Sequence, residues 1–153
     1  MNPPKYQDTE RVPQAELPVL ATRVLAALEA GPAPFCLWLI GDLGAGKTTL
    51  ARHLLRGLGV PAHVPVTSPT YTYMNEYRTP VGVWYAHLDL YRAKDSFSLE
   101  DLGLVDARRY RGFLVEWPEA IPKNPAIDPT HVLTLNFTDD PDVRQVSLVQ
   151  SQA

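Results

Sequence analysis

The sequence predicts an α/β fold whose sheet is mixed, with parallel strands at its centre and antiparallel strands added beside them. Residues 35–40 are apolar at every position, which is typical of a central strand covered on both faces. A glycine-rich turn and a helix-like segment follow that strand directly, as in units that build parallel sheets. Two later pairs of strand-like segments, each joined by a short turn, favour antiparallel hairpins.

The first elements can be placed from their periodicity. Apolar residues recur with helical spacing from Leu17 to Leu28, and Gly31-Pro32 ends the predicted helix. The apolar strand over 35–40 comes next, and residues 47–58 are typical of a second helix that ends near Gly57 or Gly59.

The later elements have weaker patterns. Residues 70–77 and 81–90 are strand-like and predict a hairpin across Arg78-Thr79-Pro80. A helix start with an acidic first turn is expected at Ser98. The remaining expected strands are residues 112–117 and a closing hairpin of 131–137 and 143–149.

Length and composition narrow the function classes. The 153 residues suit one domain, so we expect a single domain over 1–153 with a loose start up to about Pro13. The net charge of -3 is a poor general footprint for nucleic acid, so DNA is not expected as a partner, while a local basic patch stays open. No signal peptide or membrane span is expected, which favours a cytoplasmic protein. Cys36, the single cysteine, lies in the apolar strand and is expected to be an inert thiol.

The turn after the first strand carries the strongest functional signal. It matches G-x-x-x-x-G-K-[ST] in full, with the residues Gly41, Asp42, Leu43, Gly44, Ala45, Gly46, Lys47 and Thr48, followed by Thr49. Glycines let backbone N–H groups point at phosphates, and the next helix presents its N-terminus to the same anion. Lys47 is expected to reach the terminal phosphates and the Thr48 hydroxyl to bind Mg²⁺. The motif predicts a three-layer P-loop NTPase fold that binds ATP and Mg²⁺.

Acidic residues near strand ends are the expected partners of such a loop. Glu116 ends one predicted strand and Asp89 lies late in another, so both are candidates for holding the metal or the attacking water. His87 shares a face with Asp89 and is expected to be packed or hydrogen-bonded. Trp117 is expected to anchor packing. Thr70 lies in a Ser-Pro-Thr loop, either as a sensor of the γ-phosphate or as part of an ordinary turn.

Taken together, four blocks of the sequence resemble the TsaE family of bacterial tRNA threonylcarbamoyladenosine biosynthesis. They are GDLGAGKTT at 41–49, VTSPTYT at 66–72, HLDLYR at 87–92 and LVEWP at 114–118. The resemblance implies that Lys47 and Thr48 bind phosphate and magnesium, that Asp89 and Glu116 handle metal and water, and that Thr70 is a switch threonine. Arg144, before a late strand, resembles the family's late arginine, which would make it a nucleotide contact.

The same resemblance implies an activity and partners. A TsaE protein hydrolyses ATP when bound to the TsaB–TsaD pair, and is thought to reset TsaD between turnovers. The chain would then couple ATP hydrolysis to tRNA modification without modifying the base itself. Contact between the chain and tRNA stays open, and without a clearly placed arginine we expect slow hydrolysis by the isolated chain.

Three alternatives remain. A small-molecule P-loop kinase would use Arg108, Arg109 and Arg111 as a lid, although a solvated basic cluster, or a docking site for a partner or tRNA phosphates, fits the short segment better. A GTPase is disfavoured because no Asn-Lys-x-Asp motif is present. A nucleotide-binding module without hydrolysis is disfavoured by Asp89 and Glu116.

Overall fold

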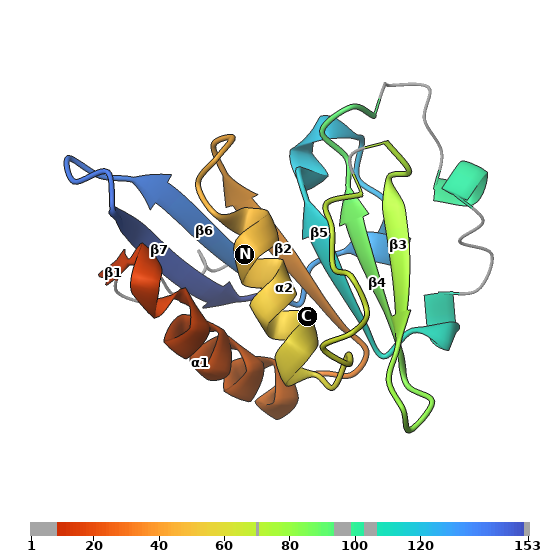
Figure 1. Cartoon of the computed structure of the whole chain (residues 1–153). Coiled ribbons are helices and arrows are strands. Elements are labelled where there is room, and N and C mark those ends of the chain that lie inside the picture. Colours follow the sequence, from red (N-terminus) through yellow and green to blue (C-terminus); the bar gives the residue numbers. More distant parts are fainter. Residues whose placement is uncertain (1–8, 70, 94–98, 103–106, 152–153) are drawn as a thin grey trace.

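The computed structural model describes residues 9–69, 71–93, 99–102 and 107–151. Within them, one seven-stranded sheet has the order β1-β7-β6-β2-β5-β4-β3 (Figure 1). The strands are β1 (Glu10–Pro13), β2 (Phe35–Gly41), β3 (Met74–Arg78), β4 (Trp84–Asp89), β5 (Gly112–Glu116), β6 (His131–Phe137) and β7 (Val143–Gln150). The α-helices are α1 (Leu17–Ala30) and α2 (Lys47–Gly57). Short 3-10 segments are η1 (Gln14–Glu16), η2 (Leu99–Leu102), η3 (Ala107–Arg109), η4 (Pro118–Ala120) and η5 (Pro125–Ile127).

The sheet is mixed in the predicted way. At the centre of the sheet three neighbouring pairs run parallel, namely β6 with β2, β2 with β5 and β5 with β4. Strand β7 joins β6 antiparallel, β1 joins β7 antiparallel, and β3 closes the other edge against β4. Both predicted hairpins are therefore confirmed.

The two α-helices lie side by side over one face of the sheet (Figure 1). Their buried residues, including Leu20 and Leu54, form one core cluster with alternate residues of β2, Leu37 and Leu39. The apolar residues whose spacing predicted α1 are thus largely the ones that the helix buries.

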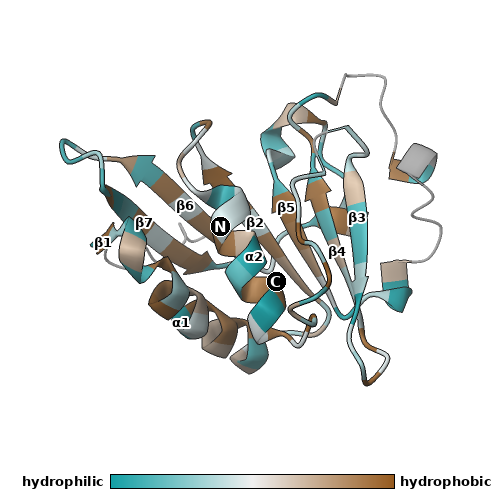
Figure 2. Cartoon of the chain, viewed as in Figure 1, coloured by the Kyte–Doolittle hydropathy of each residue, from teal (hydrophilic) through white to brown (hydrophobic). Residues whose placement is uncertain are grey.

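The other face has its own core. Cys36 of β2 and Val115 of β5 point there, with Leu99 of η2 and Ile127 of η5 packed against them. Within the described ranges, 3-10 segments and loops cover this face, and both α-helices lie on the opposite one. Because β2 and β5 are covered on both faces, they are mostly apolar, whereas the β6–β7 turn is hydrophilic (Figure 2).

The structure corrects three boundaries. The start of the chain is not loose up to Pro13, because β1 already pairs with β7, from Glu10 opposite Val146 onwards. The β3–β4 turn is longer than expected, since Thr79 N donates to Val83 O and Gly82 takes a φ of 86°. The helix expected at Ser98 is the four-residue η2, while Ser98 itself lies outside the described residues.

None of the helices within the described ranges combines the length and apolar character that a membrane span requires.

Candidate functional site

The glycine-rich loop, residues 41–48, connects the carboxyl end of β2 to the start of α2. Gly44 and Gly46 have φ values of 83° and 113°, a region that side chains with a Cβ rarely adopt. Gly41 is needed for another reason, because a Cβ there would lie 2.3 Å from Leu135 O of β6. The three glycines of the motif therefore allow the chain to curl tightly against its neighbouring strand.

Lys47, the first residue of α2, folds back onto this loop. Its Nζ donates to the carbonyl oxygens of Gly41 and Asp42, the latter at 2.9 Å. The same Nζ lies 4.3 Å from the centre of the Trp117 ring. Burial lowers the pKa of Lys47, and the charge of Glu116 opposes this shift most strongly. The loop thus holds a mostly buried amine at its centre.

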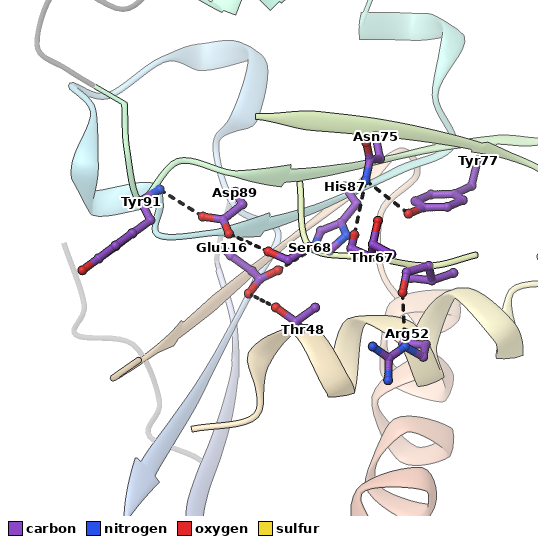
Figure 3. Close-up of polar contacts among 11 residues, drawn as sticks. Thr48, Arg52, Thr67, Ser68, Asn75, Tyr77, His87, Asp89, Tyr91 and Glu116 are labelled. Atoms are coloured by element: carbon purple, nitrogen blue, oxygen red, sulfur yellow. Dashed lines mark hydrogen bonds and ion pairs between the residues drawn. The ribbon is translucent and has the colours of Figure 1, made fainter. Parts of the chain in front are cut away.

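Two carboxylates meet beside the loop because their strands are adjacent and parallel. Asp89 ends β4, Glu116 ends β5, and the two residues are register partners. The Thr48 hydroxyl donates to Glu116 Oε1 at 2.8 Å (Figure 3). Both carboxylates are buried, with Glu116 only 2% exposed. The sheet therefore brings together the two acids and the hydroxyl that the sequence suggested as one group.

His87 explains how Glu116 is held. Its Nε2 lies 2.6 Å from Glu116 Oε2, so both oxygens of this carboxylate have partners. The imidazole has no exposed surface, and its Nδ1 has no hydrogen-bond partner among the described residues. The sequence placed His87 on the face of Asp89 but did not reveal its contact with Glu116.

Asp89 is held by a different pair of donors. The Ser68 hydroxyl donates to Oδ2 at 2.9 Å, and the Tyr91 backbone N–H donates to Oδ1 at 3.0 Å (Figure 3). Ser68 belongs to the Ser-Pro-Thr loop, so this loop does reach the site. Thr70, the switch threonine of the sequence prediction, lies outside the described residues.

These groups surround a pocket of about 360 Å³, within the usual range for small-ligand sites. Its walls include residues of the glycine-rich loop, both acids, and an aromatic and basic rim; they are Leu43, Gly44, Gly46, Lys47, Thr48, Thr49, Ser68, Asp89, Tyr91, Arg92, Glu116 and Trp117. Arg92 was not singled out from the sequence, and its guanidinium lies 4.8 Å from the centre of the Tyr71 ring.

Trp117 has an unusual backbone for a large side chain. Its φ of 56° is left-handed, which costs energy in a residue other than glycine. The ring packs against Tyr91, with 4.8 Å between ring centres, as well as against Lys47. Trp117 therefore packs within the pocket wall, which the sequence prediction of a packing anchor did not specify.

Arg144 lies behind the glycine-rich loop and does not line the pocket. Its Nε donates to Ala45 O at 2.9 Å, its Nη1 donates to Pro141 O, and its guanidinium lies over Phe137. Gly41, Asp42 and Ala45 also lie outside the pocket wall. The structure thus gives Arg144 a supporting contact to the loop backbone, and a direct nucleotide contact remains a prediction.

Comparison with known proteins gives consistent matches. A family model described as threonylcarbamoyl adenosine biosynthesis protein TsaE matches residues 13–146. The chain is 40% identical over 114 residues to the tRNA threonylcarbamoyladenosine biosynthesis protein TsaE of Haemophilus influenzae, covering 74% of this chain and 68% of that one. It is 45% identical over 86 residues to the Bacillus subtilis protein of the same name, covering 56% and 51%. The aligned region thus spans about half to two thirds of these relatives.

A solved structure agrees with the sequence matches. The crystal structure of Bacillus subtilis YdiB superposes with a TM-score of 0.66 at 26% identity, covering 99% of this chain and 90% of that one. The similarity therefore extends over nearly the whole chain, including the strands that carry the site.

Proposed function

The chain belongs to the TsaE family, and from this premise we propose that it binds ATP with Mg²⁺ and hydrolyses ATP in threonylcarbamoyladenosine biosynthesis. The observation that carries the proposal is the pocket in which the glycine-rich loop meets the Thr48–Glu116 pair. A P-loop motif requires a strand before the loop and a helix after it, and the positions of β2 and α2 support this reading. We therefore also propose the P-loop NTPase fold.

In this proposal the loop binds the phosphates. Its backbone N–H groups and the N-terminus of α2 supply partial positive charge, and Lys47 supplies a full one. The Lys47 amine now bonded to two loop carbonyls would exchange those contacts for phosphate oxygens. Burial strengthens this attraction, since a partly desolvated charge is less screened by water.

The oxygens beside the loop suit a magnesium ion. The Thr48 hydroxyl and the Glu116 carboxylate, whose oxygens lie 2.8 Å apart, would hold the ion together. Mg²⁺ is usually bound by one or two carboxylates together with substrate phosphates. Asp89 and Glu116 are the two carboxylates that line the pocket beside the loop. When bound, the ion would neutralise charge on the phosphates.

We assign the remaining steps to the two acids. Asp89 and Glu116 would position the metal and the attacking water, with Thr70 as a candidate sensor of the γ-phosphate. His87 would hold the Glu116 carboxylate in place, since it contacts the oxygen that Thr48 does not. Hydrolysis by the isolated chain is expected to be slow. P-loop proteins often need an arginine that stabilises the charge of the transition state, and the guanidinium of Arg92 at the rim lies over the Tyr71 ring instead.

The proposed role is that of an energy-coupling subunit in the cytoplasm, acting on the TsaB–TsaD pair. The names of the relatives support a place in tRNA modification. The kinase alternative gains nothing from the structure, because Arg109 contacts Trp84 at the amino end of β4, the end opposite to Asp89. These arginines are not over the pocket as a lid would be.

A calorimetric titration with ATP, with and without Mg²⁺, tests the binding site. We expect Thr48→Val to lose most of the magnesium-dependent gain in affinity, because it keeps the shape of the side chain and removes the hydroxyl. Thr48→Ser is the matched control and should retain the gain. Equal magnesium dependence in both variants would contradict the proposed role of Thr48, and no ATP binding by the unaltered chain would overturn the function itself.

A further inference from the structure

A second hollow lies at the amino ends of the parallel strands, opposite to the carboxyl ends that carry the glycine-rich loop. It has a volume of about 380 Å³, and Trp84, Arg108, Arg109 and Arg111 are among its lining residues. Trp84 begins β4 and Arg111 immediately precedes β5, so the hollow lies at the amino ends of parallel strands. The five residue steps from Trp84 to Asp89 separate the two ends by about 16 Å.

The hollow gathers more positive than negative charge. Arg108, Arg109 and Arg111 are all exposed to solvent. The Arg78 guanidinium lies beside Gly82 of the hollow, since a Cβ on Gly82 would be 3.5 Å from Arg78 Nη2. Four guanidinium groups are thus concentrated on a chain whose net charge is -3.

Among the described residues, Glu76 and Glu29 carry carboxylates that face this cluster. Glu76 Oε1 lies 3.8 Å from Arg109 Nη1, a loose ion pair, and it also accepts a hydrogen bond from the Tyr110 hydroxyl. Glu29 lines an adjoining hollow with Arg111. Even without Arg108, three arginines of the cluster face two acids among the described residues, which leaves a positive excess.

An aromatic platform lies inside the charged rim. The Arg109 guanidinium lies 4.0 Å from the centre of the half-buried Trp84 ring. A guanidinium stacked on an aromatic ring is a flat cation, on which a nucleobase stacks while neighbouring arginines bind phosphates. The planar fork of arginine suits phosphate oxygens better than a lysine would.

We propose that this arginine hollow binds the sugar-phosphate backbone of RNA, at a site separate from the nucleotide pocket. Arg78 and Arg111 would contact phosphates, and the Arg109–Trp84 stack would support an unpaired base. An acidic protein segment would satisfy the charges but would make no use of the stack. The relatives' names, which refer to tRNA, agree with an RNA ligand.

The test measures the fluorescence anisotropy of a labelled 20-nucleotide uridine RNA and of an unmodified tRNA transcript, titrated with the full chain at 50 to 200 mM salt. The two phosphate contacts of Arg78 and Arg111 with single-stranded RNA predict a slope of log affinity against log salt of about -1.4. Arg78→Gln with Arg111→Gln should weaken binding at least tenfold and make the slope shallower by about 1.4. These two side chains are exposed, so the pair should fold normally; circular dichroism checks this.

Arg11→Gln with Arg23→Gln is the matched control, because it removes the same charge from exposed arginines that pair with Asp139 and Glu10 instead. The control should bind RNA like the unaltered chain. Lys47→Ala should also bind RNA normally, which separates this site from the nucleotide pocket. Equal losses in the two arginine pairs, loss in Lys47→Ala, or no RNA binding at 50 mM salt would overturn the proposal. Binding of polyglutamate in preference to RNA would overturn it in favour of an acidic protein partner.

Discussion

Replacing Gly44 with alanine isolates the cost of backbone conformation in the glycine-rich loop. Gly44 has a φ of 83°, and a Cβ built there meets no atom within 4 Å. Within the chain itself the only penalty is therefore the left-handed backbone, about 1–2 kcal/mol for a residue with a Cβ. If the loop keeps its shape, the penalty reduces the free energy of unfolding. If the loop relaxes, the same penalty appears as weaker ATP binding.

The assay combines urea unfolding without nucleotide and calorimetric binding of ATP with Mg²⁺. For Gly44→Ala, the two losses should add up to about 1–2 kcal/mol. Gly44→Asn is the matched variant, because asparagine adopts the left-handed region more readily. It should lose clearly less than the alanine variant. Equal stability and equal ATP affinity in both variants and the unaltered chain would refute the reasoning.

Gly41→Ala should fail for a different reason. A Cβ there would lie 2.3 Å from Leu135 O, a backbone atom of β6 that can move only with its strand. We expect a loss of about 1–3 kcal/mol in the free energy of unfolding, as for other overpacked sites. Asparagine would not relieve this clash, so Gly41→Asn should be no better than Gly41→Ala.

Three further outcomes follow from buried contacts. His87→Ala removes the partner of Glu116 Oε2 and leaves a cavity, so urea unfolding should show a loss of about 3 kcal/mol. Arg144→Ala leaves Ala45 O without its 2.9 Å donor, which should cost about 1–3 kcal/mol in the same assay. Burial raises the pKa of Cys36 from 9.0 to about 12, so the native thiol should resist alkylation at pH 8. Because the folded-state pKa is the higher one, the contribution of Cys36 to stability should be retained below pH 9 and fall by roughly 1.4 kcal/mol per pH unit up to about pH 12. Cys36→Ala should lack this contribution, while Tyr85 and Tyr110, whose pKa values are also raised, should keep theirs.

The fold centre could be predicted because its signals are local. Every residue of β2 from Phe35 to Ile40 is apolar, and in the structure alternate side chains enter the two cores. The glycine pattern of the loop likewise follows from backbone requirements that lie within a few residues. Asp89 and Glu116 were found because a loop of this kind needs acidic partners near strand ends, and the structure makes the two residues register partners.

The remaining features depend on contacts distant in sequence. Strand β1 has four residues and forms only because β7 lies beside it, so no local pattern indicated it. The His87–Glu116 contact joins residues 29 apart and requires the register of β4 and β5. The left-handed backbone of Trp117 is held by its packing against Lys47 and Tyr91, which no periodicity reveals.

The most direct test of the proposed function is ATP hydrolysis by the chain with and without the TsaB–TsaD pair. We expect slow turnover alone and strong stimulation by the pair, with both lost in Lys47→Ala and Glu116→Ala. Rapid turnover by the isolated chain that Lys47→Ala abolishes would contradict the need for a partner. Absence of stimulation, together with phosphate transfer to a small metabolite, would contradict the coupling role and make the chain a kinase.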